Sequence, residues 1–180
     1  PICICTNGFV YFSQTNTVAS KLTSFDNSYL YKSLAPYNVL AAYWDDLSAD
    51  AVGTNSAGSI LYQVFNTNVS DDDTLIIQYS NVSSQYTAFG GQPRKLNFQV
   101  WLYKASGIIE FRYGSATGNS FNQDESASIG LKNATGGIGN FIDAVTGSKS
   151  ISFTMMSSSK FPGVNYRFTP GNPGPIPAGT

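Results

Sequence analysis

Histidine is absent from the 180 residues, and the only two cysteines are Cys3 and Cys5. Without imidazole, the chain has no Ser–His or Cys–His pair, no imidazole metal ligand and no usual general base near neutral pH. Two thiols fall short of the roughly four ligands of a structural zinc site. On a strand they point to the same face, and a bond between them would be strained. We expect two free, buried, small apolar side chains; pairing with another chain is the alternative.

Charge is also scarce. Charged residues make up 12% of the chain, with a net charge of −1, against roughly 25% in typical globular domains. The few Lys and Arg are scattered, which argues against a nucleic-acid partner because phosphate contacts need clustered cations. The surface must therefore be carried by Ser, Thr, Asn, Gln and Gly, a composition common on secreted and cell-surface β proteins.

Long apolar runs and processing signals are missing too. No run approaches the roughly 20 apolar residues of a membrane span, and no signal peptide is present. The chain opens on Pro1 without an initiator Met, so we expect that it begins after processing or that the sequence is incomplete.

Hydrophobic residues reach 42% and aromatics 14%, enough for one sizeable core. We expect one domain over residues 1–168. From Thr169 the chain reads TPGNPGPIPAGT, and proline at four of these positions bars it from a central ladder. Residues 169–180 are therefore expected to form a polyproline-like tail or linker.

The clearest structural signal is the run from Arg94 to Gly114. Its apolar residues lie two apart and alternate with residues of the opposite face, on both sides of a break at 104–107. This period predicts an antiparallel hairpin with one buried face, not a helix. The expected inner residues are Phe98, Val100, Leu102, Ile109, Phe111 and Tyr113, and the expected outer ones are Asn97, Gln99, Trp101, Tyr103, Glu110 and Arg112.

Other short strands surround this hairpin. Asn7-Gly8 between apolar runs predicts a tight hairpin over residues 1–13, because both residues tolerate positive φ. Weak strand character lies at 29–31. Further strands are expected at 39–44, 58–65, 74–80, 126–132, 141–145, 149–154 and 164–168. About ten short strands, with turn signals every dozen residues and no helical period, predict an all-β antiparallel sandwich.

The order of the motifs TNGFVYF (6–12), APYNVLAAYWDDL (35–47), GSILYQVF (58–65), TLIIQYSNV (74–82), LNFQVWLYKASGIIEFRYG (96–114) and ASIGL (127–131) is informative. As a set they resemble the β domains of bacterial secreted and cell-surface proteins and, more distantly, the extracellular NIDO domain of nidogen-type proteins. The resemblance implies an extracellular or cell-surface module of adhesive or architectural role, with no enzymatic activity and no catalytic residues.

Domains of this kind usually carry strands ahead of the TNGF hairpin, and here the chain starts almost on it. A sheet that lacks a strand has an unpaired edge and an open apolar groove, which another chain can fill. The donor would be the N-terminal segment, with Ile2, Cys3, Ile4 and Cys5, or the tail 169–180. Head-to-tail donation would grow a filament or surface layer, pilus-like in kind.

Several residues have a functional interpretation and a structural one. Asp45 and Asp46 follow a predicted strand. The functional interpretation of this pair is a calcium site. The structural interpretation, which is the more common arrangement, is a turn in which the Asp side chains bond nearby backbone amides. The run 71–73 is expected to be a solvated hairpin tip. Glu110 suits an ion pair with a residue such as Lys104 better than an acid catalyst, which needs a second carboxylate.

Two aromatic residues of the expected outer face, Trp101 and Tyr103, have a functional interpretation as a sugar-stacking platform, together with Tyr79, Tyr86 or Tyr113. The structural interpretation is a second buried face or a subunit interface, where aromatic residues are also enriched. Asn68, Asn81 and Asn133 begin glycosylation sequons that arise by chance in a chain rich in Asn and Ser. The favoured function is a structural homopolymer that assembles by strand exchange. The alternative is an adhesion module that binds a glycan or matrix protein.

Overall fold

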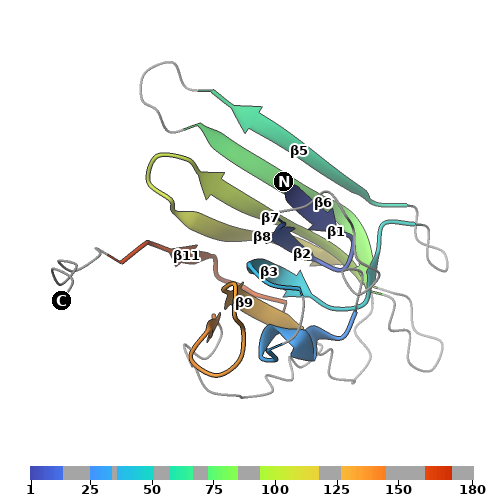
Figure 1. Cartoon of the computed structure of the whole chain (residues 1–180). Coiled ribbons are helices and arrows are strands. Elements are labelled where there is room, and N and C mark those ends of the chain that lie inside the picture. The colour runs from blue at the N-terminus through green and yellow to red at the C-terminus, as the bar shows by residue number, and fades with distance from the viewer. Residues whose placement is uncertain are drawn as a thin grey trace, which may run out of the picture.

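The computed structural model is an all-β, two-sheet structure, in which every strand pairing is antiparallel (Figure 1). The described residues are 1–13, 25–33, 36–50, 57–66, 73–84, 94–117, 127–144 and 161–171. Eleven strands lie in these ranges, which confirms the predicted sandwich-like class. Among them no helix is long and apolar enough to cross a membrane.

The five-stranded sheet has the order β1-β2-β3-β9-β10. Its strands are β1 (Ile2–Cys5), β2 (Phe9–Phe12), β3 (Val39–Trp44), β9 (Ser128–Lys132) and β10 (Phe141–Asp143). Every residue of β3 is buried, because this central strand is covered on both faces. The predicted strand at 39–44 is confirmed. Strands β9 and β10 are each shorter than the strands predicted at 126–132 and 141–145.

The six-stranded sheet has the order β11-β8-β7-β6, and both β4 and β5 pair with β6. Its strands are β4 (Leu47–Ser48), β5 (Ser59–Phe65), β6 (Thr74–Ser84), β7 (Lys95–Tyr103), β8 (Ile109–Thr117) and β11 (Tyr166–Phe168). The central hairpin β7–β8 is confirmed. The strand expected at 149–154 lies outside the described residues, and β4 lies where no strand was predicted.

The main core fills the space between the sheets. Period-two alternation turns Phe98, Val100 and Phe111 inward, and each is at most 1% exposed. Tyr79 stacks on Phe98 with ring centroids 4.5 Å apart and planes 12° apart. The inner face predicted for the central hairpin is therefore confirmed.

A second apolar cluster lies on the other face of the five-stranded sheet. There Phe9, Val39 and Trp44 pack with Leu30 and residues including Tyr31. The segment around 29–31 is not a strand, as the sequence suggested, but a 3₁₀ turn, Asn27–Leu30. Leu30 and Tyr31 are consecutive and both buried, whereas a strand would send one of them to each face.

The loop of the first hairpin is one residue longer than a two-residue turn. Cys5 pairs with Phe9, so the loop is Thr6–Gly8, and Gly8 alone takes a positive φ, 78°. Gly8 O accepts a hydrogen bond from Tyr43 N at 3.0 Å. A Cβ at Gly8 would lie 1.9 Å from Tyr43 O, so only glycine fits at this position.

Candidate functional site

The six-stranded sheet extends one strand beyond the five-stranded sheet. The Tyr79 hydroxyl of β6 donates to the carbonyl oxygens of Cys5 at 2.9 Å and Phe9 at 3.2 Å, so β6 lies beneath the β1–β2 hairpin. Strand β5 pairs with the far side of β6 and lies past β1 (Figure 1).

The edge of the core runs between β6 and β5. Tyr62 of β5 is the cross-strand neighbour of Ile77, and Val64 that of Leu75. Ile77 is fully buried, whereas Tyr62 is 71% and Val64 53% exposed. Directly paired residues share a face of the sheet, so Tyr62 and Val64 face the inner side. Within the described residues, no second layer covers them.

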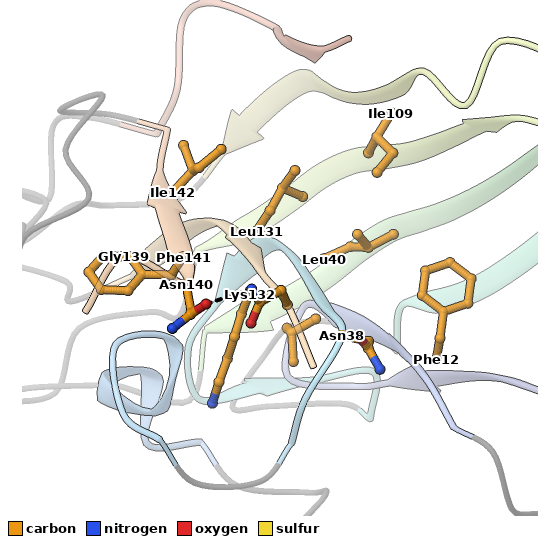
Figure 2. Close-up of a pocket in the computed structure, with 12 residues that line it drawn as sticks. Phe12, Asn38, Leu40, Ile109, Leu131, Lys132, Gly139, Asn140, Phe141 and Ile142 are labelled. Atoms are coloured by element: carbon orange, nitrogen blue, oxygen red, sulfur yellow. Dashed lines mark hydrogen bonds between the residues drawn. The ribbon is translucent and has the colours of Figure 1, made fainter. Parts of the chain in front are cut away.

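The two sheets also separate along the end of the sandwich that carries Phe12 and Ile109. Two cavities of about 420 and 510 Å³ adjoin there, and both residues line both cavities. One wall is a cross-strand row on the six-stranded sheet, Val64–Leu75–Leu102–Ile109. The other wall comes from the five-stranded sheet and includes Ile2, Leu40, Leu131 and Ile142. Figure 2 shows Leu40, Leu131 and Ile142 on the same side of the groove, with Ile109 across from them.

Strand β1 carries the free edge above this groove. Within the described residues it pairs with β2 only, and its inward side chains Ile2 and Ile4 are 40% and 37% exposed. The segment predicted as a strand donor, Ile2–Cys5, is therefore paired in its own chain. Its donation to another chain stays a prediction.

The thiols lie on the opposite face of β1, next to the second apolar cluster. Both are free, with Cys5 buried and Cys3 half-buried. Burial raises the pKa of Cys5, which holds it in the unreactive thiol form. Both thiols are free within this chain, as expected, but of the two expected buried side chains only Cys5 is buried.

The outer face of the six-stranded sheet carries a polar and aromatic network around Glu110. Arg112 Nη2 and Nε lie 2.6 and 2.8 Å from Glu110 Oε2, and Arg167 Nη1 lies 3.0 Å from Oε1. The Tyr103 hydroxyl donates to Glu110 Oε2 at 3.2 Å. The suggested pairing with Lys104 is wrong, because Lys104 bonds Asp73 at 3.0 Å.

Trp101 and Tyr103 lie together on this outer face, with ring centroids 6.2 Å apart. The Arg112 guanidinium lies 3.6 Å from the centroid of the Trp101 ring and stacks on it. Burial, followed by the charge of Glu110, raises the pKa of Tyr103. Both oxygens of Glu110 are engaged by cationic donors, an arrangement typical of a structural ion-pair cluster.

Two tyrosines suggested for an aromatic platform are on the wrong face. Tyr79 is fully buried in the main core, and the Tyr113 hydroxyl donates to Ala42 O at 2.6 Å across the sheets. Tyr86 lies outside the described residues. The platform is therefore limited to Trp101 and Tyr103 among the residues that the structure describes.

The two aspartates after β3 lie in a bend. Asp45 Oδ1 accepts the backbone N–H of Asp46 at 2.8 Å, which is the turn geometry weighed against calcium. No group of three His, Cys, Asp or Glu side chains suited to a metal occurs among the described residues. Calcium at Asp45 and Asp46 stays a prediction, and a melting temperature unchanged by a chelator would refute it.

The structure describes two of the three glycosylation sequons, those that begin at Asn81 and Asn133. Asn81 takes a positive φ of 52°, and Ser83, two residues on, is fully buried. Asn133 Oδ1 accepts the N–H groups of Thr135 at 2.8 Å and Gly136 at 3.0 Å. The third sequon, at Asn68, and most of the acidic run 71–73 lie outside the described residues.

Sequence reasoning missed the overhanging face of β5 and the buried Lys132. Strand β5 reads SILYQVF, with apolar residues on both faces, a pattern that by itself does not distinguish an uncovered strand from a buried one. Lys132 is 3% exposed with its Nζ 5.0 Å from the centroid of the Tyr37 ring. Burial lowers the pKa of Lys132 to about 8.

The chain was compared with models of known protein families. A family model described as NIDO related matches residues 1–170. No curated protein and no solved structure matches the chain.

Proposed function

Because the chain belongs to the NIDO-related family, we propose that it is a non-enzymatic, extracellular structural subunit that assembles with copies of itself by strand addition. Domains of this family are typically extracellular and are not known as enzymes. The observation that carries the proposal is the open side of the sandwich, where among the described residues β1 has a free edge and no second layer covers the inner face of β5.

A strand placed beside β1 would satisfy two needs at once. Its backbone would pair with the free N–H and C=O groups of β1, and its side chains would cover Tyr62 and Val64. Main-chain pairing of this kind gives affinity, while pockets for alternate side chains give specificity. The apolar groove lined by Phe12 and Ile109 offers such pockets.

The surface of β1 supports pairing with another chain. Natural proteins protect free edges with charges, proline or bulges, and Ile2–Cys5 carries no charge. When each copy gives its strand to the next, growth is head to tail and produces a filament or surface layer. When two copies exchange strands reciprocally, the contact closes as a dimer.

The non-enzymatic part of the proposal is supported by the Glu110 cluster. Arg112 and Arg167 engage both carboxylate oxygens, which suits a fixed ion pair better than a proton donor. The chain also lacks histidine, the usual base for catalysis near neutral pH.

A second candidate is an adhesion module that binds a glycan or a matrix protein through Trp101 and Tyr103. Both rings lie partly exposed on the outer face of the sheet, and the observation against a large platform is Arg112, which stacks on Trp101. Glycan-array binding that disappears in Trp101→Ala but survives in Tyr62→Lys would support this candidate.

Negative-stain microscopy and light scattering over a range of concentrations test the leading proposal. We expect fibres, layers or discrete oligomers whose mass exceeds that of one chain. A monomer at every concentration would overturn self-assembly and leave the adhesion module as the function to test.

A further inference from the structure

We infer that the strand that completes the five-stranded sheet is β5 of a second copy, and that the exchange is reciprocal. Each copy places its β5 beside β1 of the other, so two copies form a two-fold pair. The inference rests on the proposed self-assembly and adds the identity of the donor strand.

The overhang has the dimensions that this exchange needs. Strand β6 lies beneath the β1–β2 hairpin, as the Tyr79 hydrogen bonds show, and β5 extends one strand farther. Neighbouring strands lie about 4.8 Å apart and stacked sheets about 10 Å apart. As far as the described part of the chain shows, the space beside β1 and above β5 is therefore one strand wide and one layer deep, and β5 of a second copy has that size.

A two-fold axis parallel to the strands, midway between the sheets, relates the two copies. It carries β5 of one copy into the layer of β1 of the other, and the reverse exchange follows by symmetry. The inward side chains Ile60, Tyr62 and Val64 of the two copies then meet across the space between the sheets. Each copy covers the inner face that the other leaves exposed.

The strand directions are compatible with pairing. Tyr79, the cross-strand neighbour of Ile60, reaches Cys5 at the end of β1, while Ile2 at the start of β1 lines a cavity with Val64. Strands β1 and β5 therefore run in opposite directions. An axis parallel to the strands keeps these directions, so β5 of the second copy lies antiparallel to β1, the more stable pairing.

Charge does not oppose the contact. From Ala57 to Asn66, the ten residues that include β5, there is neither a charged residue nor a proline. Of the two strands at the other side of the sandwich, β11 carries Arg167 and β10 carries Asp143. The edges of β1 and β5 are thus uncharged, and they lie on the same side of the molecule (Figure 1).

Because donor and acceptor share one side, the contact closes. A head-to-tail filament needs them on different surfaces. The geometry therefore favours a discrete dimer over the filament that the sequence suggested, and microscopy separates these outcomes. Open-ended fibres would support self-assembly while overturning the reciprocal exchange.

Sedimentation velocity of the full chain over a hundredfold concentration range gives the first test. We expect a monomer–dimer equilibrium without larger species. Tyr62→Lys places a charge in the contact twice, once per copy, and should raise the dimer dissociation constant at least about tenfold. The control Ile138→Lys adds the same charge at a side chain that is 72% exposed, on the loop before β10, and should leave the constant unchanged.

A mixing experiment identifies the contacting strands. Ile4→Lys and Tyr62→Asp chains should each be monomeric alone and should dimerise when mixed, because one opposite-charge contact and one native contact then form. Dimerisation of mixed Tyr62→Lys and Tyr62→Asp chains, without rescue by Ile4→Lys, would instead show that β5 pairs with β5 and would overturn the inference. Equal weakening by Ile138→Lys would also overturn it, and circular dichroism confirms that each variant is folded.

Discussion

The Tyr79 hydroxyl links the β1–β2 hairpin to the larger sheet, in addition to the hydrogen bond from Leu47 N to Asn7 Oδ1 at 3.1 Å, and Tyr79→Phe removes the Tyr79 link. The side chain is fully buried, and its hydroxyl donates to Cys5 O at 2.9 Å and Phe9 O at 3.2 Å. Phenylalanine keeps the ring that stacks on Phe98. The substitution therefore deletes the hydrogen bond and leaves the apolar packing in place.

The expected cost follows from the groups left behind. A buried hydrogen bond contributes about 1 kcal/mol net, and an acceptor left unpaired adds to that. Cys5 O still accepts Gly8 N at 3.3 Å, so the penalty should stay near the lower end, about 1–2 kcal/mol. For a chain of this size that corresponds to a fall in melting temperature of about 2–8 °C.

Urea unfolding with Tyr62→Phe as the matched control gives the measurement. Tyr62 is 71% exposed, so loss of its hydroxyl should change the free energy of unfolding by less than about 0.5 kcal/mol. Both variants are compared at a concentration where the chain is monomeric. Equal costs for Tyr79→Phe and Tyr62→Phe would refute the link between the hairpin and the larger sheet.

Three further predictions concern single positions. Gly8→Ala should destabilise the fold by at least about 3 kcal/mol, because its Cβ would meet a carbonyl oxygen at 1.9 Å; Gly163→Ala, with nothing within 4 Å of its Cβ, should be nearly neutral in the same thermal melts. Burial lowers the pKa of Lys132 from 10.5 to about 8, so the unfolded chain binds more protons between these values and stability rises with pH there. Relative to Lys132→Met, the native chain should gain about 2 kcal/mol between pH 7 and 9.5 in urea titrations, and parallel pH curves would contradict this. Glu110→Gln should lower the free energy of unfolding by about 1–3 kcal/mol, because the carboxylate is 10% exposed and bonded to two guanidinium groups. Arg167→Gln, at a side chain 61% exposed, should lower it by less than about 1 kcal/mol. A larger loss for Arg167→Gln than for Glu110→Gln in urea unfolding would contradict the geometry.

Alternation in the sequence predicted the hairpin β7–β8 and its two faces. One face of that hairpin is buried, and burial of one face produces a period of two. The same alternation placed Tyr113 on the inner face, where it packs against the main core. It left the face of Tyr79 open, because that face depends on cross-strand pairing with Phe98, which a single run of sequence does not contain.

The sequence suggested that one sheet has an open edge, but it did not show where that edge lies. The resemblance to NIDO domains suggested a missing strand, but the pattern of β5 is equally typical of a strand buried on both faces. Only the layer order shows that Tyr62 and Val64 lie beyond β1. The partner of Glu110 was equally hidden, because Arg167 lies 57 residues away in the sequence.

Hydrogen exchange measured at low and high protein concentration tests the open edge most directly. If a second copy completes the five-stranded sheet, amides of Ile2–Cys5 and of Ser59–Phe65 should become protected together as the concentration rises, while those of β10 and β11 stay unchanged. Exchange that is independent of concentration at β1 and β5, or protection that appears only at other strands, would contradict strand addition at this side of the molecule.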